Sequence, residues 1–186
     1  MLNKTGRQRH YDITPTEGFA NREIGFIAAS LAELRARVVD QIEDLPKEAL
    51  DFVHPKIGFT IGQLALHMSW AEVRRLSAVL GNPIDSDLER VLSQGSLSQL
   101  GENLPPSREA AELRSIVARC TVVVDELLRP AVDLDRPRDQ DGSTLRGVLM
   151  HLQWHWSFHS GHVGLIRLLW GSDYTWTMHP PLAPRI

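Results

Sequence analysis

The sequence predicts an all-α protein folded as a four-helix bundle, and three observations favour this fold class. Apolar residues recur every three or four positions in four long segments, no segment alternates like a strand, and turn-forming residues separate the segments. The chain has 186 residues, enough to bury one sizeable core. We expect the bundle over residues 17–172, with an N-terminal arm at 1–16 and a C-terminal tail at 173–186.

The first two helices are predicted from their apolar faces and their end signals. One helix is expected from Glu17 to about Asp44, ended before Pro46. A second is expected between Thr60, a suitable N-cap, and Gly81, a C-terminal stop. The apolar face of the first helix consists of Ile24, Ile27, Ala28, Leu31, Leu34, Val38 and Ile42.

A long crossover is expected between the second and third helices. Residues 82–106 are rich in Ser, Gly, Pro and Asn, with one short helical pattern around 85–92. Ser107 is the predicted cap of the third helix, which runs to about Arg129 and is ended by Pro130. We therefore treat residues 82–106 as a long connection between the second and third helices.

The fourth helix is predicted to open at Ser143 or Thr144 and to reach Trp170, with Gly171 just beyond its end. Its polar residues include an unusual group of histidines. The chain has eight histidines, and four of them fall within twelve residues of this helix.

Composition excludes several classes of partner. Twenty Lys and Arg residues against 23 Asp and Glu give a net charge of −3, so nucleic acid is not expected as a partner. The sequence has neither a signal-peptide pattern nor a long apolar run, so no membrane partner is expected. Cys120 is the only cysteine and lies on the apolar face of the third helix, where burial is expected. A cytoplasmic protein acting on a small molecule is the resulting expectation.

The four clustered histidines share one face of the fourth helix. At about 100° per residue they project within a sector of about 80°, beside apolar residues that face the core. Burying imidazoles without partners costs about 1–3 kcal/mol each, and a divalent metal ion would satisfy them. The four are His151, His155, His159 and His162.

Three histidines are the candidate metal ligands. His155 and His159 are four residues apart, and His67 is an unexpected polar residue in the apolar context of the second helix. His151 and His162 are expected to pack or hydrogen-bond around the site, and bonding of all these histidines to backbone carbonyls is the alternative. Zinc or nickel is the expected ion, with iron or copper as further alternatives.

These motifs resemble the DinB/YfiT-like superfamily. The segments are TIGQLALHMSW and TLRGVLMHLQWHWSFHSGHVGLIRLLWG, and the resemblance spans about residues 20–171. It implies a four-helix bundle in which His67, His155 and His159 hold a divalent metal, and a homodimer, because members are often dimers. Mycothiol-dependent isomerases of this superfamily have Glu where this chain has His155. Many relatives have a second His at the position of Phe158.

Three neutral imidazoles leave a divalent ion with its full charge and an open position, which is typical of a catalytic site. The ion can hold the thiolate of a low-molecular-weight thiol or acidify a water. We expect the first, a thiol S-transferase or isomerase, because the resemblance includes such enzymes; a metal-dependent hydrolase is the alternative. The alternative from another functional class is a non-catalytic binding protein. In it the metal only joins the second and fourth helices and takes a fourth ligand from His151 or His162. The catalytic base stays open among His151, His162 and Glu72.

Overall fold

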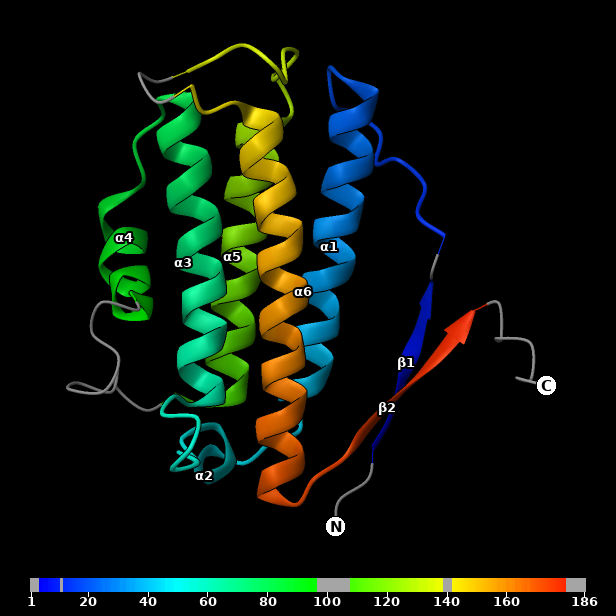
Figure 1. Cartoon of the computed structure of the whole chain (residues 1–186), viewed down its shortest axis with the longest axis vertical. Helices are drawn as coiled ribbons and strands as arrows, with labels where there is room; N and C mark the ends of the chain where they lie inside the picture. The colour runs from blue at the N-terminus through cyan, green and yellow to red at the C-terminus, as the bar shows by residue number, and fades with distance from the viewer. Residues whose placement is uncertain (1–3, 11, 97–107, 139–141, 180–186) are drawn as a thin grey trace.

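The protein is a four-helix bundle, as the sequence predicts. A computed structural model describes residues 4–10, 12–96, 108–138 and 142–179 (Figure 1). The four long helices are α1 (Arg22–Ile42), α3 (Ile61–Leu80), α5 (Ala110–Leu128) and α6 (Leu145–Trp170). Shorter elements are α2 (Lys47–Leu50), α4 (Ser86–Leu92) and a 3-10 turn, η1 (Ser93–Gly95). Among these described residues, no helix is both long and apolar enough to cross a bilayer.

Each long helix packs mainly against two neighbours. α6 contacts α1 and α3, and α5 contacts the same two helices, so α1 and α3 occupy diagonal corners of the bundle. α3 and α5 run in the same direction, because the chain returns along the bundle between them (Figure 1). α4 and η1 belong to this return and lie against α3. The predicted crossover therefore places η1 beside the second long helix.

The ends of α3 and α6 follow the predicted signals. The Thr60 hydroxyl accepts a hydrogen bond from the Gln63 N–H at 3.0 Å, and the Gln63 side-chain oxygen accepts one from the Thr60 N–H at 2.9 Å. Gly81 and Gly171 end the two helices in the left-handed conformation that favours glycine. Thr144 caps α6 through its hydroxyl.

Two predicted helix starts differ from the structure or lie outside it. α1 begins at Arg22 rather than Glu17, because Asn21 is its N-cap. The Asn21 side chain accepts a hydrogen bond from the Glu23 N–H at 2.8 Å, and the Asn21 backbone is extended and not helical. α5 begins at Ala110, after Glu109 as its N-cap. The cap predicted for this helix, Ser107, lies outside the described residues.

No strand is predicted from the sequence, yet the structure pairs one segment near each end of the chain. β1 (Lys4–His10) and β2 (Tyr174–His179) form a parallel two-stranded ribbon beside α1 (Figure 1). Arg9 connects the ribbon to the bundle by donating from Nε to the Asp40 carboxylate of α1 at 2.8 Å. Such pairing joins residues far apart in sequence, so local periodicity gives no signal for it.

Candidate metal centre

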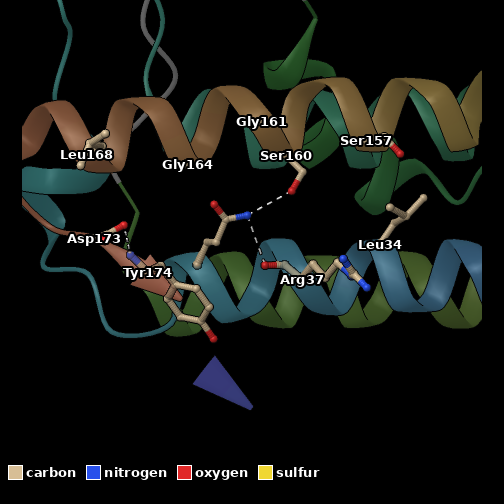
Figure 2. Close-up of a pocket in the computed structure, with 10 residues that line it drawn as sticks. Leu34, Arg37, Ser157, Ser160, Gly161, Gly164, Leu168, Asp173 and Tyr174 are labelled. Atoms are coloured by element: carbon tan, nitrogen blue, oxygen red, sulfur yellow. Dashed lines mark hydrogen bonds between the residues drawn. The ribbon is translucent and has the colours of Figure 1, made fainter. Parts of the chain in front are cut away.

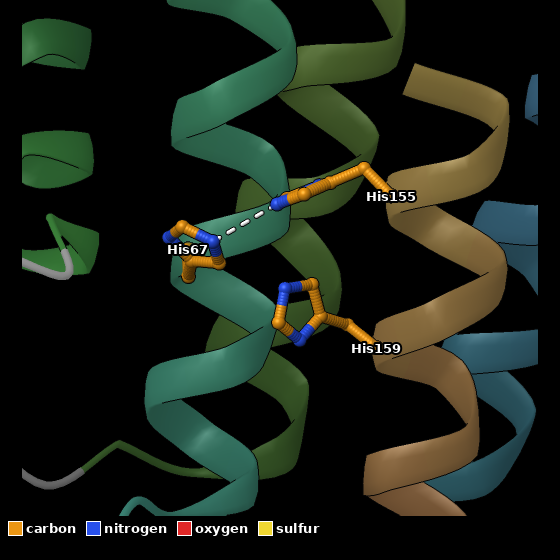
Figure 3. Close-up of side chains that lie close together, drawn as sticks. All are labelled: His67, His155 and His159. Carbon is orange, nitrogen blue, oxygen red and sulfur yellow. Dashed lines mark hydrogen bonds between the residues drawn. The ribbon is translucent and has the colours of Figure 1, made fainter. Parts of the chain in front are cut away.

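The structure brings the three candidate ligands together in the interior between α3 and α6 (Figure 3). His67 projects from α3, and His155 and His159 project from α6 to meet it. The Nε2 atoms of His67 and His155 are 2.9 Å apart, and one ligand atom from each ring lies within 4.8 Å of the others. The side chains are buried, with exposures of 4%, 7% and 9%.

Helical spacing explains why these rings meet. His155 and His159 are one turn apart on the inner face of α6, between the buried Leu152 and Val163. Their ring centroids are 4.6 Å apart. His67 lies beside the fully buried Met68 on α3, and its ring is 4.8 Å and 5.0 Å from the two rings of α6. Packing of two apolar helix faces therefore positions all three imidazoles.

A hydrogen bond from the crossover orients His67. Its Nδ1 lies 3.0 Å from the carbonyl oxygen of Gly95 in η1. A carbonyl only accepts, so Nδ1 carries the proton and Nε2 presents its lone pair to the cluster. A ligating histidine typically donates its second N–H to such a partner. Gly95 comes this close because it has no side chain: a Cβ would lie 2.5 Å from the Leu66 carbonyl carbon.

The electrostatic environment keeps the cluster neutral. Burial lowers the pKa of His155 to about 3, and the charges of His67 and His159 lower it further. Burial is also the main reason that the pKa of His159 falls to about 4. The pKa of His67 is lowered by burial as well, against a smaller opposing effect of the Gly95 hydrogen bond. Near neutral pH all three rings are therefore neutral, as metal ligation requires.

A divalent ion would satisfy the Nε2 atoms of His67 and His155 that face each other, and two further buried nitrogens of the cluster lack a hydrogen bond within the described chain. Nδ1 of His155 and Nδ1 of His159 are buried and have no hydrogen-bond partner among the described residues. Two imidazole lone pairs facing each other at 2.9 Å repel unless a proton or a cation lies between them. Three neutral, convergent imidazoles are a donor set that suits zinc, nickel or iron.

His151 and His162 flank the cluster without joining it. Both are half-buried, with ring centroids 5.6 Å from His155 and 5.5 Å from His159 respectively. Within the part of the chain that the structure describes, the group of ligand atoms close enough to share an ion contains only the three histidines. An ion held by these three side chains would therefore have at least one coordination position for another molecule.

Glu72 does not face this centre, so it is removed from the candidates for a catalytic base. It is fully buried and accepts two hydrogen bonds from Arg35 of α1, at 2.9 Å and 2.7 Å. The pair joins the diagonal helices α1 and α3, and Cys120 and Asp125 of α5 lie near it. Cys120 is buried as predicted, and burial followed by the charge of Glu72 raises the pKa of its thiol to about 12. That thiol is not a nucleophile at neutral pH.

A separate pocket of about 440 Å³ lies on another side of α6, facing α1 (Figure 2). Small residues of α6, Ser160, Gly161 and Gly164, line it, and the Gln41 side chain donates across it to Ser160 at 3.0 Å. None of the three clustered histidines lines this pocket. It is therefore distinct from the candidate metal centre.

Sequence reasoning missed two features of this region. The Gly95 carbonyl carries no signal in residue type, because any residue has a carbonyl. Arg35 and Glu72 did have a signal: each interrupts an apolar stripe, Arg35 between Leu31 and Val38. Opposite charges on the core faces of two helices predict a buried pair.

Comparison with known proteins identifies a family. The family model described as mycothiol-S-transferase matches residues 26–170, which include all three clustered histidines. This match covers most of the chain and extends from α1 to the last residue of α6. No curated protein gives a significant match.

Proposed function

Because the chain belongs to the mycothiol S-transferase family, which is DinB/YfiT-like, we propose that it transfers the thiolate of mycothiol to a small electrophile with the aid of a divalent metal. His67, His155 and His159 are the proposed ligands. The observation that carries the proposal is the convergence of three buried, neutral imidazoles from α3 and α6. Zinc or nickel is the proposed ion, and iron is the alternative.

A bound divalent ion would lower the pKa of a coordinated thiol, so that the thiolate forms at neutral pH. The residues of the chain supply the rest. Neutral histidines add no negative charge, so they leave the ion's charge available for the thiolate. The Gly95 carbonyl holds the His67 ring with Nε2 toward the cluster. The exposed Arg75 acts weakly on His151 and His155, and its positive charge would make a small contribution in favour of a thiolate over a thiol.

The proposed reaction balances without a redox partner. The thiol proton passes to solvent or buffer as the thiolate forms. The sulfur lone pair then makes a bond to the electrophilic carbon, while the bond from that carbon to its leaving group breaks. The leaving group departs with the bonding electrons, as a halide does from an alkyl halide. The proposed route of both reactants to the buried cluster passes His151 and His162, because these two flanking side chains are only half-buried.

Cobalt substitution tests this proposal directly. Protein loaded with Co(II) and titrated with mycothiol should develop a sulfur-to-cobalt charge-transfer band, because a thiolate is a soft donor. His159→Ala should lose the band and retain cobalt poorly, because one of three ligands is gone. Leu165→Ala, an exposed position on the same helix, is the control and should match wild type.

A different set of results would contradict the S-transfer proposal. A wild-type protein that holds cobalt, shows no spectral response to mycothiol and hydrolyses an ester would contradict the proposal. It would favour a metal-dependent hydrolase instead.

A further inference from the structure

Two aromatic side chains on the outside of α6 form an exposed stacked pair. Trp154 is 60% exposed and Phe158 is 51% exposed. Their ring centroids are 5.4 Å apart, with 20° between the ring planes. Large aromatic side chains are usually well buried, so a stacked pair left open to solvent is a surface suited to another apolar group. We call Trp154 and Phe158 the aromatic shelf.

The aromatic shelf is continuous with the candidate metal centre. The Phe158 ring meets the rings of His159 and His162 edge to face, at centroid distances of 5.3 Å and 4.6 Å. The Trp154 ring lies 5.7 Å from His151, which in turn stacks on His155 at 5.6 Å. Adjoining rings thus lead from the solvent to the buried cluster by two routes.

The arrangement follows from the helical angle of about 100° per residue. Around α6, the side chains pass from exposed aromatic residues, through half-buried histidines, to the buried ligand candidates. In order around the helix they are Trp154, Phe158, His151, His162, His155 and His159. A molecule lying on the shelf therefore has one edge at the rim of the cluster.

We propose that the aromatic shelf binds the acceptor of the transfer reaction, and that the acceptor is an electrophile carrying an aromatic ring. This inference rests on the proposed S-transfer and names its second substrate class. A ring on the shelf gains offset stacking and buries apolar surface of Trp154 and Phe158. Its reactive carbon then lies toward the cluster. With a benzylic halide, the thiolate sulfur bonds to the benzylic carbon as halide leaves with the electron pair.

The first test measures binding without chemistry. The unreactive ring compound 4-nitrotoluene is titrated into the purified protein and followed by ligand NMR. Trp154→Ala and Phe158→Ala should each weaken its binding about 3- to 10-fold, because each removes one stacking face. Leu165→Ala is the matched control: it is 46% exposed and lies on the same side of α6, about 10 Å farther along. It should change binding by less than about twofold.

The second test measures transfer from mycothiol to two electrophiles. With 4-nitrobenzyl chloride, kcat/KM should fall about 3- to 10-fold in Trp154→Ala and in Phe158→Ala. With iodoacetamide, which has no ring, both variants should stay within about twofold of wild type. The cobalt–thiolate band should be the same in wild type and in both variants, because the shelf does not hold the thiol.

Each outcome decides between the two proposals. Equal binding of 4-nitrotoluene to wild type and to both shelf variants overturns the aromatic shelf, whatever the turnover shows. An equal loss with both electrophiles overturns it as well. Leu165→Ala could also weaken 4-nitrotoluene binding as much as the two shelf variants and change the sedimentation coefficient. In that case the exposed face of α6 that contains the shelf and Leu165 is a contact between two copies of the chain, and the proposed acceptor site is wrong. Failure of transfer with every electrophile, while 4-nitrotoluene still binds to the shelf, contradicts the S-transfer proposal alone.

Discussion

Two of the buried polar side chains of α3, His67 and Glu72, lie five residues apart and have very different partners. Glu72 is matched by Arg35, with two short hydrogen bonds between opposite charges. His67 meets two further imidazoles, all neutral, and the Nδ1 atoms of both partners have no hydrogen bond within the described chain. Both carboxylate oxygens of Glu72 are matched by an opposite charge, and only Nη1 of Arg35 lacks a hydrogen bond among the described residues. The histidine cluster has no opposite charge among its described neighbours and leaves two buried nitrogens unpartnered.

The angle between the two positions explains how one helix serves both. Five residues correspond to a rotation of about 140° beyond one full turn. His67 therefore faces α6, while Glu72 faces the diagonal helix α1. A closed ion pair restricts how the helices pack, and an open cluster creates a place for chemistry. The difference teaches that a buried polar group indicates function mainly when its own protein partners are insufficient.

The largest expected effect comes from breaking the Arg35–Glu72 ion pair. Glu72→Ala leaves the Arg35 guanidinium buried without its carboxylate, which should lower the free energy of unfolding by about 3–5 kcal/mol. Urea denaturation of the metal-free protein measures this change. Asp87→Ala, which removes an exposed ion pair with Arg90, is the control and should cost less than about 1 kcal/mol.

Two further measurements distinguish loss of the ion pair from damage to the histidine cluster. The double variant Arg35→Met/Glu72→Leu should recover much of the lost stability, because apolar residues of similar volume can replace a buried ion pair. Cobalt affinity in Glu72→Ala should stay close to wild type, since Glu72 faces away from the histidines. A Glu72→Ala protein that is as stable as wild type but cannot bind cobalt would reverse the roles assigned to the two clusters.

Much of the fold was predictable because its signals are local. Apolar periodicity indicated the four helices, and Thr60, Gly81 and Gly171 marked helix ends. The start of α1 was misplaced, because the sequence EGFA at residues 17–20 does not by itself distinguish a helix from the segment that leads into it. The β1–β2 ribbon was missed because it pairs the two ends of the chain, and the energy of that pairing depends on tertiary structure.

The site was predictable to the extent that residue type reveals it. Histidines at positions that face the core indicated which side chains would meet, and the structure places His67, His155 and His159 together. The Gly95 hydrogen bond was not predictable, because it depends on where the crossover packs against α3. The exposure of Trp154 and Phe158 also depends on the tertiary arrangement, since aromatic residues on a helix are more often core.

The next prediction tests the orientation of the open cluster. In Gly95→Ala the new methyl group would collide with the backbone of Leu66 and His67, so η1 must move and the hydrogen bond to His67 Nδ1 should be lost. Loss of such a partner typically weakens metal binding about 10- to 100-fold, which corresponds to about 1.4–2.7 kcal/mol. Competition with a chelator measures the affinity.

The nitrogen spectrum of His67 separates orientation from general damage. Wild type should show the proton on Nδ1, and Gly95→Ala should show exchange between the two tautomers in a long-range ¹H–¹⁵N experiment. Gly161→Ala is a matched helical control, because a Cβ there meets no atom within 4 Å. Unchanged metal affinity in Gly95→Ala, with the His67 tautomer altered, would show that the carbonyl does not contribute to ligation.

Per histidine and per pH unit, the smallest expected effect is the pH dependence that the neutral cluster gives to the metal-free protein. The folded-state pKa is about 3 for His155 and about 4 for His159, mainly because of burial, against an unfolded value of about 6.5. The unfolded chain therefore binds more protons than the folded chain below pH 6.5. Stability should be greatest above that pH and should fall as the pH drops, by at most about 1.4 kcal/mol per pH unit for each histidine.

Urea denaturation at pH 7, 6 and 5 measures this slope in a window where most carboxylates stay ionised. The double variant His155→Leu/His159→Leu keeps every other titrating group, so the difference between the two slopes isolates the cluster. We expect the variant to lose less stability on acidification than wild type. Parallel slopes would mean that both histidines take up protons in the folded state as readily as in the unfolded chain. In that case the cluster would not be held neutral, and its contrast with the closed Arg35–Glu72 pair would disappear.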